Sequence, residues 1–118
     1  MVSLSAMRYS VVLVPFPFDD LSGTKVRPAV CLTDAVGTHR HVVLAFITSS
    51  LSPKPEASDI LLDPSSAEFR STGLKVPSAL RLHRLITVSS SIIVRQLGVL
   101  PPKAQQEVQQ RLRELFRL

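Results

Sequence analysis

The chain has 118 residues, the length of one domain, so we expect residues 1–118 to fold as a single domain. Its 14 Lys and Arg residues outnumber its 9 Asp and Glu residues, and its 45% hydrophobic content excludes an intrinsically disordered chain. No apolar run approaches the roughly 18 residues that span a bilayer, and no signal-peptide pattern opens the chain. Because Cys31 is the single cysteine, a disulfide scaffold is also excluded. We therefore expect a cytoplasmic protein with no membrane partner.

Positive charge is concentrated in the second half of the chain. No Asp or Glu occurs from Phe69 to Gln106. The cations in this stretch are Arg70, Lys75, Arg81, Arg84, Arg95 and Lys103. Such a stretch attracts polyanions, which indicates either nucleic acid or an acidic protein partner. The alternative is a solvated basic face that only keeps the protein soluble.

The first half of the chain predicts three strands. The predicted strands are residues 9–14, 27–33 and 41–47. Pro15 and Pro17 end the first strand because proline cannot donate to a sheet ladder. Residues 19–24 have turn chemistry and predict an exposed loop, and a turn around Gly37 joins the second and third strands.

The second half predicts three further strands. The predicted elements are a loop at 51–58, a strand at 59–62, a helical turn at 64–69 ended by Gly73, and strands at 76–88 and 91–97. Leu80 and Leu82 share one face of the long strand, and strict alternation would put Arg84 there too. A bulge near His83 would turn Arg84 outward; without one, Arg84 faces a cleft or a partner.

The last segment predicts an amphipathic helix that begins at Pro101-Pro102. Its apolar stripe is Val108, Leu112, Leu115 and Phe116, at spacings i, i+4, i+7 and i+8. Several short strands followed by one such helix predict a mainly β protein with a C-terminal helix. The sheet is expected to form a small barrel or to curve strongly, with the helix packed on it.

Three groups have residue types suited to catalysis or metal binding but lack suitable neighbours. His39 and His41 have no third ligand at a usual spacing, so we expect no metal and no cofactor. Cys31 lies in an apolar strand, where a cysteine is usually a small buried hydrophobe rather than a nucleophile. Asp19-Asp20 precede Ser-Gly and predict a polar turn rather than an acid–base pair.

Arg27 and Thr48 are stronger candidates. Arg27 begins an apolar strand directly after a loop, and Thr48 ends another directly before a loop. If these strands are neighbours, both side chains reach the same rim of the sheet, where a guanidinium and a hydroxyl can hold two phosphate oxygens. The alternative is an edge arginine bonded to a loop carbonyl.

Four motifs of this chain resemble those of the MazF/PemK-like toxin family. They are VLVPFPFDDLSGTKVRPAV at 12–30, AFITS at 45–49, GLKVPSALRL at 73–82, and LGVL at 97–100 followed by the amphipathic helix. The motifs come in the family's order and cover nearly the whole chain.

The resemblance implies an SH3-like β-barrel with a C-terminal helix, of the MazF/CcdB/Kid type, usually as a homodimer. It implies a growth-inhibiting, metal-independent endoribonuclease that cleaves single-stranded RNA at short sequences. The family's catalytic pair maps onto Arg27, the Arg before Pro-Ala, and Thr48, the Thr of Ile-Thr-Ser. The implied protein partner is a cognate antitoxin whose flexible tail occupies the RNA groove, and DNA is expected to be reached only through that antitoxin.

Further RNA contacts are expected beside this pair. The candidates are Phe16 and Phe18 for base stacking, and Lys25, Ser49, Arg81 and Arg84 for the RNA backbone. The alternatives are aromatic rings that anchor the loop to the core and cations that are only solvated. The chain departs from the family at Tyr9-Ser10, where many members have Gly-Asp, and at His83, where an acidic or other polar residue is frequent.

Two other functions remain open. One is a non-enzymatic toxin that, like CcdB relatives, poisons DNA gyrase through C-terminal helix residues. The other is a nucleic-acid-binding module that has lost catalysis. The intact Arg-Pro-Ala and Ile-Thr-Ser motifs favour the nuclease.

Overall fold

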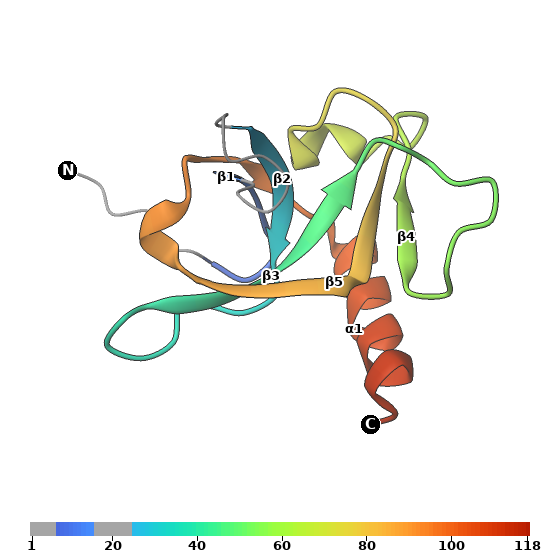
Figure 1. Ribbon diagram of the computed structural model, residues 1–118. Helices are drawn as coiled ribbons and strands as arrows, with labels where there is room; N and C mark the ends of the chain where they lie inside the picture. Colours follow the sequence, from blue (N-terminus) through green and yellow to red (C-terminus); the bar gives the residue numbers. More distant parts are fainter. Residues whose placement is uncertain (1–6, 16–24) are drawn as a thin grey trace.

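A computed structural model describes residues 7–15 and 25–118. The expected loop at 19–24, the Asp19-Asp20 pair, and Phe16 and Phe18 lie outside these ranges. The strands are β1 (Ser10–Pro15), β2 (Val26–Cys31), β3 (His41–Thr48), β4 (Asp59–Leu62), β5 (Ser78–Ser89) and β6 (Arg95–Val99). The helices are the 3-10 helices η1 (Phe69–Thr72) and η2 (Ser90–Ile92) and the α-helix α1 (Pro102–Phe116) (Figure 1).

The six strands form one antiparallel sheet in the order β4-β5-β3-β2-β1-β6. The sheet curves into a half-barrel, and α1 leaves it at one end (Figure 1). This confirms the expected mainly β architecture with one C-terminal helix. No helix in the described ranges is both long and apolar enough to cross a membrane.

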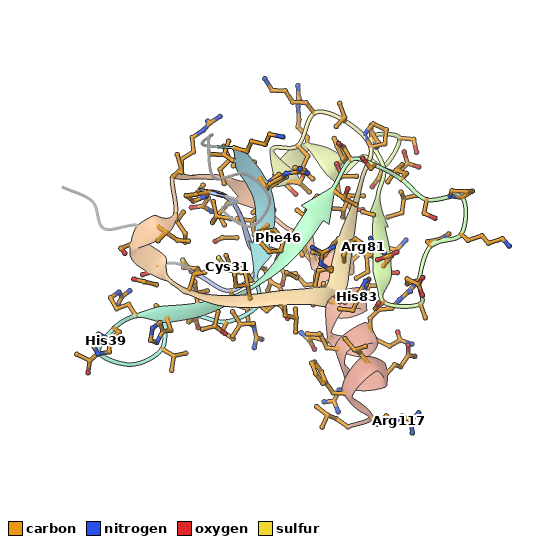
Figure 2. The ribbon with its side chains drawn as sticks, viewed as in Figure 1. Cys31, His39, Phe46, Arg81, His83 and Arg117 are labelled. Carbon is orange, nitrogen blue, oxygen red and sulfur yellow. The ribbon has the colours of Figure 1, made fainter. Side chains whose placement is uncertain are left out.

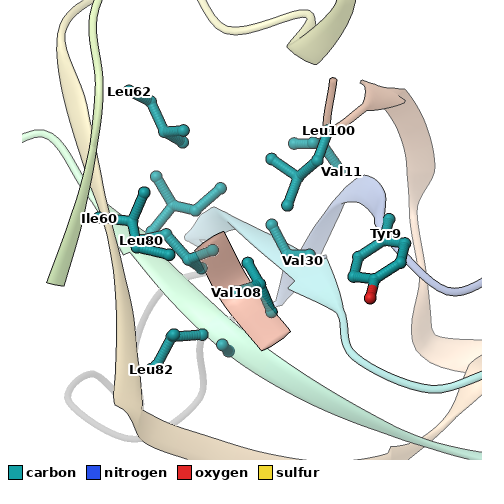
Figure 3. Close-up of a cluster of buried hydrophobic side chains, with 11 residues drawn as sticks. Tyr9, Val11, Val30, Ile60, Leu62, Leu80, Leu82, Leu100 and Val108 are labelled. Carbon is teal, nitrogen blue, oxygen red and sulfur yellow. The ribbon is translucent and has the colours of Figure 1, made fainter. Parts of the chain in front are cut away.

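Both faces of the central strands are buried. On one face, Val30, Leu80 and Ile60 pack with Val108 of α1 (Figure 3). On the other face, Ala29, Cys31 and Leu44 belong to a second apolar cluster. Neighbouring residues of β2 thus point into different clusters, which explains why its sequence is an almost continuous apolar run.

The long strand β5 contains a bulge near His83, the first of the two alternatives that the sequence left open. Ala45 of β3 pairs with Leu85, whereas the next residue, Phe46, pairs with Arg81, so three residues of β5 lie between these two pairs. Leu82 stays buried, and Arg84 is exposed. The bulge therefore turns Arg84 outward and leaves the two leucines of β5 in the core.

Two sequence-based boundaries were wrong. The helical turn expected at 64–69 is a 3-10 helix at Phe69–Thr72, because the side chains of Asp63 and Ser66 accept hydrogen bonds from nearby backbone N–H groups and favour turns. The strand expected at 91–97 starts only at Arg95. The Ser89 hydroxyl accepts a hydrogen bond from the Ser91 N–H and starts η2 instead.

Only the first half of the apolar stripe of α1 is covered by the sheet. Val108 is buried and Leu112 half-buried, whereas Leu115 and Phe116 are 38% and 55% exposed. The end of the helix extends past the sheet (Figure 1). The expected packing of the helix on its own sheet is therefore confirmed for its first half.

The backbone has an unusual conformation at Tyr9, where the sequence differs from the Gly-Asp of many family members. Tyr9 has a φ of 74°, a backbone conformation that favours the Gly found there in many family members. The Tyr9 side chain is buried, and its hydroxyl accepts a hydrogen bond from Gln109 Nε2 at 2.9 Å. The Tyr9 side chain thus links the start of the sheet to α1.

Candidate functional site

Arg27 and Thr48 come from neighbouring strands. β2 and β3 pair Ala29 with Phe46 and Val30 with Ala45. Extending this register by two residues sets Arg27 opposite Thr48, and directly opposite residues of an antiparallel pair point to the same face. Both residues are half-buried. The strand pairing that the candidate pair requires is therefore present.

Arg81 belongs to the same face of the sheet. Phe46 pairs with Arg81 of β5, which pairs in turn with Asp59 of β4. Thr48 pairs with Ala79, two residues from Arg81 along β5. Because side chains two residues apart in a strand share a face, Thr48, Arg81 and Asp59 all point to one side of the sheet.

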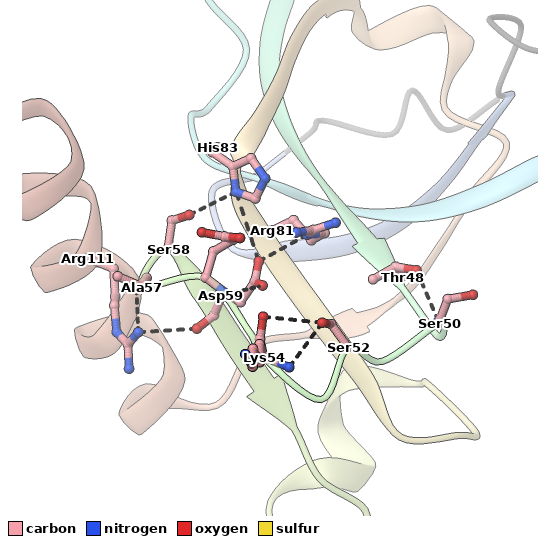
Figure 4. A network of polar contacts seen from close by, with 11 residues as sticks. Thr48, Ser50, Ser52, Lys54, Ala57, Ser58, Asp59, Arg81, His83 and Arg111 are labelled. Carbon is pink, nitrogen blue, oxygen red and sulfur yellow. Dashed lines mark hydrogen bonds and ion pairs between the residues drawn. The ribbon is translucent and has the colours of Figure 1, made fainter.

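The Thr48 hydroxyl is oriented by its own loop. Its Oγ1 accepts a hydrogen bond from the backbone N–H of Ser50 at 3.0 Å (Figure 4). Within the described residues this hydroxyl donates to no protein acceptor, and a hydroxyl both donates and accepts. Thr48 therefore keeps one proton with which to bond an oxygen of a bound ligand.

Arg81 is held by a buried carboxylate. Asp59 Oδ1 accepts a hydrogen bond from Arg81 Nε at 3.1 Å, and Asp59 Oδ2 accepts one from the backbone N–H of Glu56 at 2.9 Å (Figure 4). The Asp59 side chain is 6% exposed and that of Arg81 29% exposed. Since the ion pair uses Nε, the two terminal nitrogens of the guanidinium remain available to a ligand.

His83 lies beside this ion pair. Its Nδ1 is 2.8 Å from Ser58 Oγ and 4.0 Å from Asp59 Oδ1 (Figure 4). The same ring nitrogen faces the serine and the aspartate, so the group lacks the geometry of a Ser-His-Asp triad, in which opposite nitrogens face the two partners. His83 therefore contributes a polar side chain at the bulge of β5.

Arg111 ties α1 to the loop that ends at β4. It donates hydrogen bonds to the carbonyl oxygens of Ala57 and Asp59 (Figure 4). Its Nη2 also forms an ion pair with Glu107 at 3.0 Å. The helix thus fixes the C-terminal end of the loop between β3 and β4.

These groups surround a hollow of about 500 Å³, a size typical of ligand sites. Its lining residues are Thr48, Ser50, Leu51, Ser52, Pro55, Glu56, Asp59, Leu61, Ala79, Arg81, Glu107 and Arg111. Of the residues expected to contact RNA, Arg81 lines the hollow together with Thr48. Lys25, Ser49 and Arg84 are exposed and are not among the lining residues.

Several charged residues of the hollow were not expected from the sequence. Asp59, Glu56 and Arg111 meet there through contacts between segments that are distant in the chain. The only available signal was the acidic residue at the start of the predicted strand 59–62, and an acid at a strand end is too common to indicate a site.

The basic stretch does not form one acid-free surface. Asp59 pairs with Arg81 across the β4–β5 ladder. Arg95 lies on β6, which β3, β2 and β1 separate from β5. Cations that are close in sequence are thus divided between two parts of the sheet.

The histidine pair lies far from the hollow. His39 and His41, at the hairpin before β3, have ring centroids 5.9 Å apart, and His39 is at the opposite end of the sheet from Arg81 and His83 (Figure 2). Within residues 7–15 and 25–118, no three His, Cys, Asp or Glu side chains are grouped as a metal site.

Cys31 has the environment of a core residue. It is fully buried in the second apolar cluster. Burial, assisted by the negative charge of Asp34, raises the pKa of its thiol from 9.0 to about 11. The thiol is therefore protonated at neutral pH, which confirms the expectation of a buried hydrophobe.

The fold is a mainly β half-barrel with one C-terminal helix. Residues 7–116 match the model of the PemK-like, MazF-like toxins of type II toxin–antitoxin systems, and the chain belongs to this family, whose members are known as endoribonucleases.

Solved structures share this fold. Toxin MazF-mt6 of Mycobacterium tuberculosis is 20% identical, with 92% of this chain and 97% of that chain covered and a TM-score of 0.67. MazF of Deinococcus radiodurans is 19% identical, with 97% and 98% covered and a TM-score of 0.70. An endoribonuclease from a mycobacterial species, solved in complex with its cognate antitoxin, is 15% identical, with 95% of each chain covered and a TM-score of 0.66. No curated protein matches the chain.

Proposed function

We propose that this chain is a toxin that cleaves single-stranded RNA at short sequences without a metal ion, with Arg27 and Thr48 as its catalytic residues. The observation that carries the proposal is the pairing of β2 with β3, whose register extends to an Arg27–Thr48 pair on one face of the sheet. Membership of a family of endoribonucleases supports the same activity.

The proposed reaction uses the 2′-hydroxyl of the RNA as nucleophile. Its oxygen forms a bond to the adjacent phosphorus and loses its proton, while the bond from phosphorus to the 5′-oxygen breaks and that oxygen gains a proton. The products are a 2′,3′-cyclic phosphate and a 5′-hydroxyl end. The protein has to align the phosphate and stabilise the charge that grows on its non-bridging oxygens.

Arg27 and Thr48 have the chemistry for this task. A guanidinium group stays protonated in proteins, so Arg27 acts by electrostatic stabilisation rather than by moving a proton. Thr48 donates its remaining hydroxyl proton to a second phosphate oxygen, since its Oγ1 already accepts from Ser50. DNA lacks the 2′-hydroxyl and is not cut.

Other residues bind the rest of the RNA strand. Arg81, held by Asp59, contacts a phosphate through its terminal nitrogens. Lys25, Ser49 and the outward-facing Arg84 are exposed, as backbone contacts require. Phe16 and Phe18 are proposed to stack on bases.

We also propose a cellular compartment, an oligomeric state and a protein partner for this chain. The chain acts in the cytoplasm as a homodimer and is silenced by a cognate antitoxin, through which DNA is reached indirectly. Three of the similar structures are complexes, one of a mycobacterial endoribonuclease with its cognate antitoxin and two of MazE-MazF from Deinococcus radiodurans. An acidic antitoxin tail would bind at Arg81 and Arg84. Binding that weakens with salt and on charge reversal at these two positions is expected; insensitivity to both would contradict this part.

The test is cleavage of a long single-stranded RNA in EDTA, with analysis of the product ends. Arg27→Ala and Thr48→Ala should each lower the rate about 10²–10³-fold. Arg113→Ala and Thr87→Ala replace exposed residues of the same types on α1 and β5 and should cut like the wild type. Circular dichroism confirms that each variant is folded.

The outcomes separate the candidate functions. Discrete cuts with cyclic-phosphate ends, lost in the first two variants only, support the nuclease. A folded, antitoxin-free wild type that cuts no RNA refutes it, and inhibition of DNA gyrase is then the next activity to test. RNA binding without cleavage, unchanged in Arg27→Ala, would instead identify a binding module that has lost catalysis.

A further inference from the structure

The hollow beside Thr48 differs in charge from the rest of the protein. The chain carries a net charge of +5, yet three carboxylates line the hollow against two guanidinium groups. Asp59 is paired with Arg81, and Glu107 with Arg111. The carboxylate of Glu56 has no hydrogen bond or ion pair within the described residues. One uncompensated negative charge therefore remains in the lining.

This charge decides which part of a nucleotide enters the hollow. A carboxylate repels a phosphate. An uncharged base experiences no such repulsion, and its amino groups are hydrogen-bond donors that a carboxylate accepts. The phosphates therefore stay at the wall of the hollow that carries the donors of Thr48 and Arg81, and the attached base points inward.

The walls suit a flat ring. Leu51 and Leu61 are 44% and 59% exposed, although both are large and apolar, and both line the hollow with Pro55 and Ala79. Exposed apolar side chains that meet in one concave site mark a ligand surface. Between them, the ring of a base buries apolar area while its edge reaches the polar groups.

The backbone around Glu56 is held by the sheet and by the helix. Its backbone N–H donates to Asp59 Oδ2 at 2.9 Å, and Asp59 is itself bonded to Arg81. The carbonyls of Ala57 and Asp59, which follow Glu56, are bonded to Arg111 of α1. The backbone that carries this carboxylate is thus fixed from both the sheet and the helix.

From these observations we infer that the hollow is a base-specificity site, in which Glu56 accepts a hydrogen bond from the amino group of cytosine, adenine or guanine and disfavours uracil. Uracil has a carbonyl where cytosine has its amino group, and two acceptors repel each other. Its one ring N–H donor lies between two projecting carbonyls, so a carboxylate that approaches it meets an acceptor on each side. The inference rests on the proposed nuclease function and adds the chemistry of one base next to the cut.

The first experiment measures base preference at each position around the cuts in a randomised RNA. Uracil should be disfavoured about ten- to a hundredfold at one position within two nucleotides of the cleaved bond. Glu56→Gln should lose this discrimination because an amide both donates and accepts, and Glu56→Asp should retain part of it. Glu68→Gln, an exposed carboxylate outside the hollow, is the matched control and should cut with wild-type preferences.

A second experiment separates this inference from the nuclease proposal. Fluorescent DNA strands, which lack the 2′-hydroxyl and stay intact, carry dC, dA, dG or dU at one position, and anisotropy gives their affinities. Weaker binding of dU that Glu56→Gln abolishes supports the site, even if the wild type cuts no RNA. Equal affinities for all four bases, or cleavage with unchanged preferences in Glu56→Gln, would overturn it.

Discussion

Replacing Asp59 by Asn removes the negative charge that holds Arg81 without changing the size of the side chain. The Asn carbonyl still accepts the hydrogen bond from the Glu56 N–H. Its NH2 group faces Arg81 Nε, and because both groups are donors, no hydrogen bond forms between them. The variant therefore loses one charge-assisted hydrogen bond and keeps the other contact.

The structure sets the size of the effect. A hydrogen bond to a charged group contributes about 1.5–3 kcal/mol to stability. The Asp59 side chain is 6% exposed, but that of Arg81 is 29% exposed, so water partly replaces the lost partner. We expect the free energy of unfolding to fall by about 1–2 kcal/mol.

Urea unfolding followed by circular dichroism at pH 7 measures this change. Asp63→Asn is the matched control. Its exposed side chain accepts from the Ser65 N–H, a bond that the amide retains, so its stability should change by less than about 0.5 kcal/mol.

A double-mutant cycle with Arg81→Met tests the cause. The coupling energy between Asp59→Asn and Arg81→Met should be at least about 0.5 kcal/mol, since each substitution breaks the same bond. If the two effects add to within about 0.3 kcal/mol, the ion pair between Asp59 and Arg81 does not stabilise the fold.

Three further predictions concern the fold. Because the pKa of Cys31 is about 11 in the folded chain and 9.0 is its ordinary value, the thiol leaves stability unchanged below pH 9 and lowers it by about 1.4 kcal/mol per pH unit between 9 and 11. Urea midpoints across this range should fall more in the wild type than in Cys31→Ala, and parallel curves would contradict the assignment. Tyr9→Phe should lower the free energy of unfolding in urea by about 0.5–1.5 kcal/mol, because the hydrogen bond from Gln109 is lost. A Gln109→Ala substitution added to Tyr9→Phe should then cost little more, since that hydrogen bond is already gone. Gly98→Ala places a Cβ against the backbone carbonyl of Ser71, and an unfolding free energy reduced by about 3 kcal/mol or more is expected; a thermal unfolding midpoint equal to that of the wild type would show that the contact relaxes.

Local patterns predicted most of the strands. The apolar runs of β1, β2 and β3 and the strand β4 lie within a few residues of their expected positions. Burial on one or both faces of a sheet dictates residue type at each position, so such strands are readable from composition. The boundaries near Asp63 and Ser91 were wrong because side-chain hydrogen bonds to the backbone competed with the expected elements.

The catalytic candidates Arg27 and Thr48 could also be predicted from local sequence patterns. Arg27 and Thr48 interrupt apolar strands at their loop ends, and the pairing of β2 with β3 follows from their closeness in the chain. The Arg-Pro-Ala and Ile-Thr-Ser motifs then indicated the family.

By itself the sequence determined the mainly β fold, the buried thiol of Cys31 and the two strand ends that carry the candidate catalytic pair, because each depends on residues a few positions apart. Tertiary structure alone decided that Arg84 turns outward, that Asp59 holds Arg81, and that Glu56 lines a hollow beside Thr48. These features depend on a bulge and on contacts between distant segments. No local pattern encodes such contacts, since they exist only once the sheet has curved and the helix has packed against it.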